Sequence, residues 1–492
     1  MDTSTWQPTT QACIDALIDQ NPWRSLGRVP DPFYKPVRRF LASHLWRALL
    51  GKSNRFQVVL GPRRVGKSVT LYQTVQSLIE DGVDPRHVWY MRMDHPLLMT
   101  YDLGTWVKAI VGEQQTTQYL LLDEINYAKQ WDRWLKTFFD EQLPVKIVAT
   151  SSSTAALRDG FESGIGRWSE QFLTPYTFSE FLSLRQSFTC TDIAGSPNLF
   201  ETIATFVANC PTYDALESDR RRYLLIGGFP ELLLAHEQTE DVKNALLRSQ
   251  QTLRSEAVQR VAGMDLPQVF NIQNPILLEK LIYLLGQRMC GLSNVSNLAS
   301  TLEITRPTVQ QYIEYLEKAF LVFNLPNYSP KEDAIQRRGR KVFFVDGAVR
   351  NAALQRGLAP ADDPHEMGLL VENAAAAHLY TLSLQNGVRI FHWRDSTQAE
   401  VDLIYDDTSA PIAFEITTLR DHDLSGLRAL MQKYPRFKGR CFLVSSHSNS
   451  SHHARMPSGS ADGVGRISFD AFLMAVSAQV RAALGLRLET AL

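Results

Sequence analysis

The stretch that decides the fold of the first domain is FQVVLGPRRVGKSVTLYQTVQSLI, residues 56–79. It opens with the short apolar run FQVVL, which predicts a buried strand, and it ends with apolar residues at helical spacing. Between them, GPRRVGKS at residues 61–68 matches the pattern G-x-x-x-x-G-K-[ST]. The glycines let backbone N–H groups turn inward around phosphates, and the start of a helix adds a favourable dipole. The stretch therefore predicts a phosphate-binding loop between a strand and a helix.

The predicted ligand of this loop is ATP with Mg²⁺. Lys67 is expected to reach the β- and γ-phosphates, and the hydroxyl of Ser68 is expected to ligate the metal. The full set of predicted nucleotide-binding residues is Gly61, Pro62, Arg63, Arg64, Val65, Gly66, Lys67, Ser68 and Val69.

A second motif is QYLLLDE, which ends in Asp123 and Glu124. Asp123 comes 56 residues after Lys67. An apolar run that ends in two acids predicts a buried strand that carries carboxylates to its C-terminal edge, where α/β proteins bind their ligands. Asp123 is expected to hold magnesium through water. Glu124 is expected to orient the attacking water as a general base.

Composition places the chain among globular proteins of several domains. Its 492 residues suggest two to four domains, and 44% hydrophobic content allows each to bury a core. The net charge of −1 means that any nucleic-acid contact must come from local basic patches. The five cysteines lie far apart, and we find neither a signal peptide nor an apolar run of about 20 residues. We expect a soluble, cytoplasmic protein without membrane contact.

Further apolar runs alternate with helical patterns beyond the loop. HVWYMRM (87–93), YLLLD (119–123) and KIVAT (146–150) read as strands, and WDRWLKTFF (131–139) reads as a helix. Alternating strands and helices predict an α/β fold with a parallel sheet covered on both faces.

At this point the chain resembles a known family, the bacterial and archaeal AAA-superfamily ATPases with a winged-helix segment and a C-terminal PD-(D/E)XK nuclease-like domain. Besides the two motifs, the resemblance rests on DEINYAKQWDRWLKTFFD, TPYTFSEFL, YLLIGGFPE, KVFFVDGAVRNAAL and WRDSTQAEVDLIY, and it covers roughly residues 55–445. We expect these divisions: an N-terminal extension (1–54), a P-loop ATPase core (55–176), a helical lid (177–270), a winged-helix segment (271–335) and a nuclease-like domain with a restriction-endonuclease-like α/β fold (336–492).

The resemblance implies two further roles at the nucleotide. A polar residue after the KIVAT strand, Ser151 or Ser152, would sense the γ-phosphate. Arg167 would act as an arginine finger or sensor, which implies a homo-oligomer. The alternative for Arg167 is a surface salt bridge.

The predicted winged-helix segment contains NLASTLEITRPTVQQYIEYLEKAFLVFNL. Its second helix is expected to bury Val309, Tyr312, Ile313 and Leu316, which leaves outward-facing Arg, Thr and Gln side chains suited to DNA or RNA. The run QRRGRK, which includes residues 337–341, is the most basic short stretch. The alternative is that this segment packs only against the core or a partner protein.

In the resembled nuclease fold, three acids chelate Mg²⁺ and a lysine follows the last acid by two residues. The matching positions here are Glu372, Asp402 and Glu415, and the lysine position holds Thr417. We expect weak metal binding at most and no efficient cleavage; Lys433 is the nearest lysine in sequence that could replace the missing one.

Three functions remain open at this level. The first is an ATPase that remodels or moves along nucleic acid, and the second is an ATP-gated switch that binds DNA or a partner with little turnover. The third is an ATP-controlled, Mg-dependent nuclease. An intact Glu124 favours the first, and the lack of global basicity favours the second.

Overall fold

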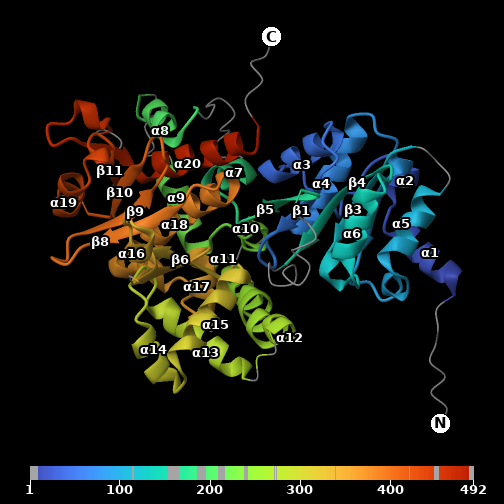
Figure 1. The fold of residues 1–492 in the computed structure, drawn as a ribbon, viewed down its shortest axis with the longest axis horizontal. Coiled ribbons are helices and arrows are strands. Elements are labelled where there is room, and N and C mark those ends of the chain that lie inside the picture. Colours follow the sequence, from blue (N-terminus) through green and yellow to red (C-terminus); the bar gives the residue numbers. More distant parts are fainter. Residues whose placement is uncertain are drawn as a thin grey trace. The chain divides into compact units, whose positions relative to one another are not determined.

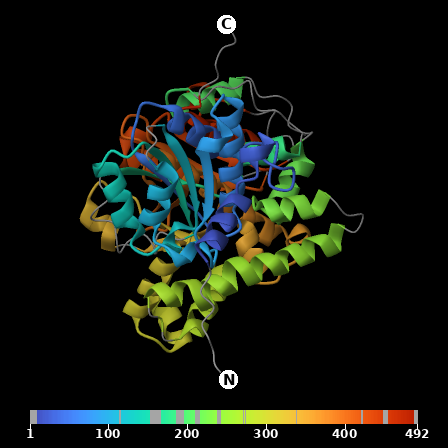
Figure 2. The ribbon, with the colours of Figure 1, turned by 90° about the vertical axis from the view of Figure 1, so that its right-hand side faces the viewer.

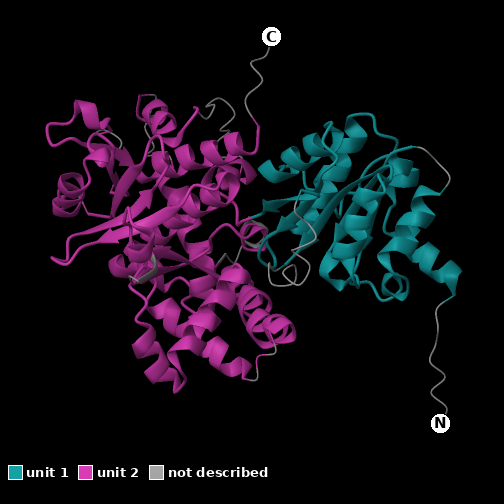
Figure 3. Cartoon of the chain, in the orientation of Figure 1, with its two compact units in different colours: residues 1–173 teal, residues 174–492 magenta. Residues whose placement is uncertain are grey.

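A computed structural model gives the fold of the chain in two compact units, residues 1–173 and 174–492 (Figures 1 and 3). The structure describes residues 9–112, 116–152, 166–185, 196–208, 216–237, 242–270, 272, 274–337, 339–419, 422–447 and 454–486.

The first unit is built on a parallel sheet of five strands in the order β2-β3-β4-β1-β5. The strands are β1 Phe56–Leu60, β2 Val88–Arg92, β3 Gln118–Asp123, β4 Val145–Ser151 and β5 Trp168–Phe172. All five residues of β1 are buried, as a strand in the middle of a sheet covered on both faces requires. This is the α/β core that the apolar runs predict.

Helices flank this sheet on both sides (Figure 2). They are α1 Thr10–Asp19, α2 Trp23–Leu26, α3 Phe40–Leu50, α4 Lys67–Glu80, α5 Leu103–Val111 and α6 Trp131–Asp140, with short 3₁₀ turns at Pro85–His87, Leu98–Thr100 and Ile125–Tyr127. The described residues before β1, from residue 9 on, belong to this unit. Trp23 Nε1 donates to Val88 O at 3.0 Å, and Asn21 Nδ2 donates to Tyr90 O at 2.9 Å.

The second unit contains a mixed sheet in the order β12-β11-β10-β9-β8. The strands are β8 Ile390–Arg394, β9 Glu400–Tyr405, β10 Ile412–Thr417, β11 Cys441–Ser445 and β12 Val464–Ser468. The first three strands are antiparallel, and β10, β11 and β12 are parallel. The long helix α18 (Pro364–Asn386) packs against this sheet and against α20 (Phe469–Ala483), and α19 (Ser425–Lys433) packs on β9 and β10.

The predicted helical lid does not form a body of its own within the second unit. Helices α7 and α8 pack against α20, and α9 packs against α17 and α18. The elements of this part are α7 Phe178–Leu184, α8 Leu199–Ala208, α9 Glu217–Ile226, α10 Pro230–Glu237, α11 Val242–Leu253, π-helical turns at Arg254–Gln259 and Val261–Asp265, α12 Leu266–Phe270, and α17 Gly347–Ala353, with a 3₁₀ turn at Ala359–Asp362. These helices therefore belong with the C-terminal sheet.

A small helical segment follows, with α13 (Pro275–Gln287), α14 (Val295–Leu302), α15 (Arg306–Lys318) and α16 (Glu332–Arg337) around an antiparallel pair of strands. These strands are β6 (Val322–Pro326) and β7 (Arg340–Phe344), and Leu292 makes an isolated bridge to Lys341. The predicted boundary at residues 335–336 falls inside this strand pair. The KVFFVD strand pairs with β6 and lies outside the C-terminal sheet.

Among the helices that the structure describes, none is both long enough and apolar enough to cross a membrane.

Candidate functional site

The phosphate-binding loop runs from the C-terminal end of β1 to the first turn of α4, as the sequence predicts. Gly66 has a φ of +96°, a conformation that glycine adopts without steric cost. A Cβ atom on Gly61 would lie 2.1 Å from Leu173 O, so this position has no room for a side chain. The loop thus needs both glycines for its shape.

Lys67 and Ser68 begin α4 directly after the loop. The side chain of Lys67 lies within the loop, where its Nζ donates to Gly61 O and Pro62 O at 3.0 Å each. The hydroxyl of Ser68 donates to Asp123 Oδ2 at 2.5 Å. The loop and the end of β3 are therefore joined through one hydroxyl–carboxylate contact.

Asp123 is buried and accepts hydrogen bonds from both strands that flank β3. Tyr90 OH on β2 donates to Oδ2 at 2.7 Å, and Thr150 Oγ1 on β4 donates to Oδ1 at 2.5 Å. Sequence reasoning missed Tyr90 and Thr150. Both are polar side chains within apolar strands, but only the strand order β2-β3-β4 places them beside Asp123. Three hydroxyl groups fix the orientation of this carboxylate.

Glu124 stands at the end of β3 in a left-handed conformation, with a φ of +52°. Its backbone N–H donates to Thr150 Oγ1 at 3.0 Å. Its carboxylate Oε2 is buried and has no hydrogen-bond partner among the described residues. Burial raises the pKa of this carboxyl, while the positive charges of Lys67 and Arg63 and a hydrogen bond from Ser152 act in the opposite direction. A buried carboxylate with a raised pKa is suited to accept a proton.

Ser151 and Arg167, which the resemblance assigns to the γ-phosphate, contact other residues of the first unit. Ser151 ends β4, and its hydroxyl donates to Asn126 Oδ1 at 3.3 Å. Arg167 precedes β5, and its Nε donates to Asp140 Oδ1 at 2.9 Å. Because β5 runs parallel to β1, Arg167 lies at the N-terminal edge of the sheet, about 16 Å of strand away from the loop. The role of Arg167 as an arginine finger or sensor stays a prediction.

The residues of the loop and of β3 suit ATP and magnesium chemically. Mg²⁺ prefers hard oxygen ligands, and the Ser68 hydroxyl and the Asp123 carboxylate supply oxygens beside the start of α4. The first backbone N–H groups of α4 lie where a phosphate would be favoured by the helix dipole.

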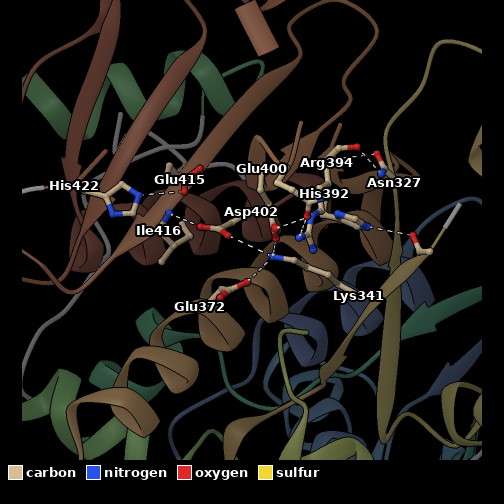
Figure 4. A network of polar contacts seen from close by, with 12 residues as sticks. Asn327, Lys341, Glu372, His392, Arg394, Glu400, Asp402, Glu415, Ile416 and His422 are labelled. Carbon is tan, nitrogen blue, oxygen red and sulfur yellow. Dashed lines mark hydrogen bonds and ion pairs between the residues drawn. The ribbon is translucent and has the colours of Figure 1, made fainter. Parts of the chain in front are cut away.

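The predicted C-terminal acids lie near one another, but a lysine stands among them (Figure 4). Glu372 comes from α18 and Asp402 from β9, and Lys341 reaches both from β7. Its Nζ is 3.2 Å from Glu372 Oε1, 3.4 Å from Asp402 Oδ1 and 2.5 Å from Glu400 Oε1. Burial lowers the pKa of this lysine, but the three carboxylates outweigh it and hold the pKa well above its ordinary value.

The three predicted ligands do not converge on one point. Glu415 Oε1 pairs with His422 Nε2 at 3.1 Å, and Asp402 Oδ2 accepts from Ile416 N at 2.9 Å. Over the residues that the structure describes, no group of three or more His, Cys, Asp or Glu side chains is arranged to hold a metal ion. Burial raises the pKa of Glu372 to about 8 and that of Glu415 to about 7, with the charge of Asp402 adding to both. The predicted magnesium site at Glu372, Asp402 and Glu415 stays a prediction; in this structure these side chains pair with Lys341, Ile416 N and His422.

The lysine that joins the cluster is also different from the predicted one. Lys433 Nζ lies 5.5 Å from the ring centre of Trp393 and 5.8 Å from that of Tyr434, as a cation beside aromatic faces. The sequence places Lys341 in the basic run of residues 337–341 and not among these acids.

Helix α15 buries the four residues that its spacing predicts, Val309, Tyr312, Ile313 and Leu316. Arg306, Gln310, Gln311 and Glu314 are exposed, while Thr308 is half-buried. Of the basic run, Arg340 is exposed, whereas Lys341 is buried in the carboxylate cluster and cannot contact nucleic acid. Arg338 lies outside the described residues.

Comparison with known families divides the chain into three matched parts. Residues 53–182 match the model of an AAA domain. The first unit is similar to AAA domains. Residues 217–359 match one domain of unknown function (DUF8612), and residues 367–457 match another (DUF4143). The first of these two matches contains both β6 and β7, so the paired strands belong to the same matched segment.

The chain is also similar to proteins without an assigned role. An uncharacterized protein of Methanocaldococcus jannaschii is 27% identical over 67% of this chain and 68% of its own length. One from Haemophilus influenzae is 24% identical over 61% of this chain and 69% of its own length.

Solved structures give weaker likenesses. The RuvB Holliday junction branch migration motor of Thermotoga maritima is 16% identical, with a TM-score of 0.27 over 63% of this chain and 96% of that one. AMPPCP-bound DnaA from Aquifex aeolicus is 16% identical, with a TM-score of 0.24 over 56% of this chain and 86% of that one. With such low TM-scores, neither structure supports a shared activity.

Proposed function

We propose that this protein binds ATP with Mg²⁺ at the loop of residues 61–68 and hydrolyses it. The observation that carries the proposal is the arrangement of Ser68, Asp123 and Glu124 around the start of α4. The match of residues 53–182 to an AAA domain supports it independently.

Each residue has a distinct role in this proposal. Lys67 places a positive charge against the β- and γ-phosphates, and the loop N–H groups bind their oxygens. Ser68 and Asp123 hold the metal, with Tyr90 and Thr150 fixing the carboxylate. When bound, Mg²⁺ neutralises phosphate charge. Glu124 orients water and accepts its proton at the unpartnered Oε2.

The test is ATP turnover and nucleotide binding measured separately in two variants. Lys67→Ala removes the cation that faces the phosphates and is expected to weaken binding. Glu124→Gln is expected to keep binding and lose turnover, because the amide cannot accept a proton from water. A Glu124→Gln protein that hydrolyses ATP at the wild-type rate contradicts the assignment of the base.

We propose further that turnover is coupled to a nucleic acid through a winged-helix segment around α15. The support is the exposed polar face of α15 together with exposed Arg340 at the start of β7. Glu314 on the same face is unfavourable for phosphate. Phosphate contacts release counterions, so affinity should fall steeply with salt.

Two measurements separate this coupling from the alternatives. ATP hydrolysis with and without double-stranded DNA, single-stranded DNA and RNA distinguishes a nucleic-acid-stimulated ATPase from a switch with little turnover. Charge reversal at Arg306 and Arg340 is expected to weaken binding, whereas reversal of exposed Arg28 in the first unit is not. Equal affinity in both variants would favour a partner protein over nucleic acid.

A homo-oligomer is part of the proposal because an arginine finger in trans acts at the nucleotide of a neighbouring copy. If Arg167 is an arginine finger in trans, Arg167→Ala lowers turnover by about 10³ without changing ATP affinity. Specific activity that stays constant on dilution of a monomeric protein would leave Arg167 with its salt bridge to Asp140 alone.

A further inference from the structure

The side chain of Lys341 is an internal cation within a carboxylate cluster built by other elements. Lys341 belongs to β7, which pairs with β6, whereas Glu372 belongs to α18 and Glu400 and Asp402 belong to β9. The lysine side chain is 5% exposed, and its Nζ contacts all three carboxylates at 2.5–3.4 Å (Figure 4). The ammonium therefore lies where the acids come together.

This position leaves no place for a divalent metal. Mg²⁺ requires oxygen ligands at about 2.0–2.1 Å in octahedral geometry. Two of the predicted ligands, Glu372 and Asp402, already accept from Lys341, and the second oxygen of Asp402 accepts from Ile416 N. The third, Glu415, turns one oxygen to His422. The residues present do not fit the metal that the nuclease resemblance implies.

We propose that the ammonium of Lys341 is the resident cation of this cluster, and that it replaces a divalent metal and fastens β7 to α18 and β9. In this role the cluster is a structural contact that connects β7 to α18 and β9 within the second unit, and it is not a site of phosphodiester cleavage. The contact links the segment of residues 217–359, which contains β7, to that of residues 367–457, which contains the acids. This inference is independent of the proposed ATPase activity.

A second contact between the same elements provides a matched control without charge. The side chain of Asn373 on α18 is fully buried; its Oδ1 accepts from Phe344 N at 2.9 Å, and its Nδ2 donates to Phe344 O at 3.1 Å. Loss of Asn373 weakens the attachment of β7 through hydrogen bonds. Loss of Lys341 weakens it and also leaves three carboxylates without a counter-charge, which is strongly destabilising in a buried site.

The experiment follows thermal unfolding of the full chain, without nucleotide, as Mn²⁺ or Mg²⁺ is added. The wild-type Tm is expected not to change. Lys341→Ala is expected to lower the Tm, and millimolar Mn²⁺ is expected to restore part of the loss because the acids regain a cation. Asn373→Ala is expected to lower the Tm without any restoration by metal. An Asp123→Asn background identifies any ion held at the nucleotide site.

Three results would overturn the proposal. One is saturable Mn²⁺ binding by the wild type that disappears in Asp402→Asn, and another is Mg-dependent DNA cleavage lost in the same variant. The third is a folded Lys341→Ala protein whose Tm does not respond to divalent ions. If Lys341→Ala does not fold, Lys341→Gln replaces it, since the amide keeps hydrogen-bond donors without the charge, and the wild-type titration decides independently of any variant.

Discussion

Two groups of carboxylates lie beside buried strands in this protein, and their partners differ. At the nucleotide loop, Asp123 accepts from the hydroxyls of Ser68, Tyr90 and Thr150, and Glu124 Oε2 has no partner among the described residues. In the C-terminal cluster, three carboxylates surround the ammonium of a single lysine (Figure 4).

The two sets of partners differ in whether they compensate the negative charge of the carboxylates. Hydroxyl groups orient a carboxylate without cancelling its charge, so the charge can still attract a cation. An ammonium both orients and compensates the carboxylates, and burial then makes its removal costly. Buried acids can therefore serve at a reaction site or hold structural elements together. The neighbouring cation decides between them.

The largest expected difference between the two groups is in ATP turnover. Glu124→Gln should lower kcat by about 10² or more because it removes a proton acceptor. Glu415→Gln is the matched change beside the C-terminal cluster and should leave kcat within about twofold of wild type, since Glu415 pairs with His422. Steady-state ATPase assays compare the two, and equal losses would mean that both groups serve the reaction.

A smaller effect is expected from the residues that orient Asp123. Tyr90→Phe and Thr150→Val each remove one hydroxyl that orients Asp123. Each should raise the Mg²⁺ concentration needed for half-maximal turnover by about 10-fold, because changes next to metal ligands lower metal affinity. Tyr119→Phe on β3 is the control, since Tyr119 makes no contact with Asp123 among the hydrogen bonds described. Titration of activity with Mg²⁺ distinguishes the variants. Identical magnesium curves would show that Ser68 alone suffices.

A further effect, on stability instead of turnover, concerns Asp346, a buried carboxylate that belongs to neither group. It accepts from Gly228 N at 2.6 Å and Ala348 N at 2.7 Å, and burial raises its pKa from 3.8 to about 6. The unfolded chain therefore loses this proton at lower pH than the folded chain, and stability falls as pH rises through this window. Asp346→Asn should remove up to about 3 kcal/mol of that pH dependence.

Urea unfolding at about pH 4 and about pH 7 tests this prediction. The stability of Asp346→Asn relative to wild type should be higher at the upper pH. A difference that does not vary with pH would show that the pKa of Asp346 is the same in the folded and the unfolded chain.

The sequence predicts local features of this protein well and distant partners poorly. The strands around QYLLLDE and the buried stripe of α15 follow from spacing alone, because period and apolarity are properties of a single segment. The hydroxyls on Asp123 could be foreseen only from the strand order β2-β3-β4, which places Tyr90 and Thr150 beside it.

The C-terminal cluster shows where such reasoning stops. The family pattern places a lysine two residues after Glu415, where this chain has Thr417, and Lys433 is the nearest lysine in sequence that could replace it. The lysine that reaches the acids is 31 residues before Glu372, on a strand that pairs elsewhere. The pairing of β7 with β6 determines where Lys341 lies, and the spacing of apolar residues along the sequence does not predict such a pairing. Likewise, the domain boundary expected at residues 335–336 splits a strand pair that only the fold defines.

The attachment of the helices α7 and α8 to α20 has a consequence for the order in which the chain is made. All five strands of the first unit precede residue 173, so its sheet is complete early in synthesis. Ser196 O, just before α8, accepts from Gln479 Nε2, 283 residues later. At roughly 5–20 residues per second, this partner emerges roughly 15 to 60 s after the helix. Until then the buried side chains of α8, which include Ile203 and Phe206, have no cover from α20, and such exposed apolar surface favours aggregation.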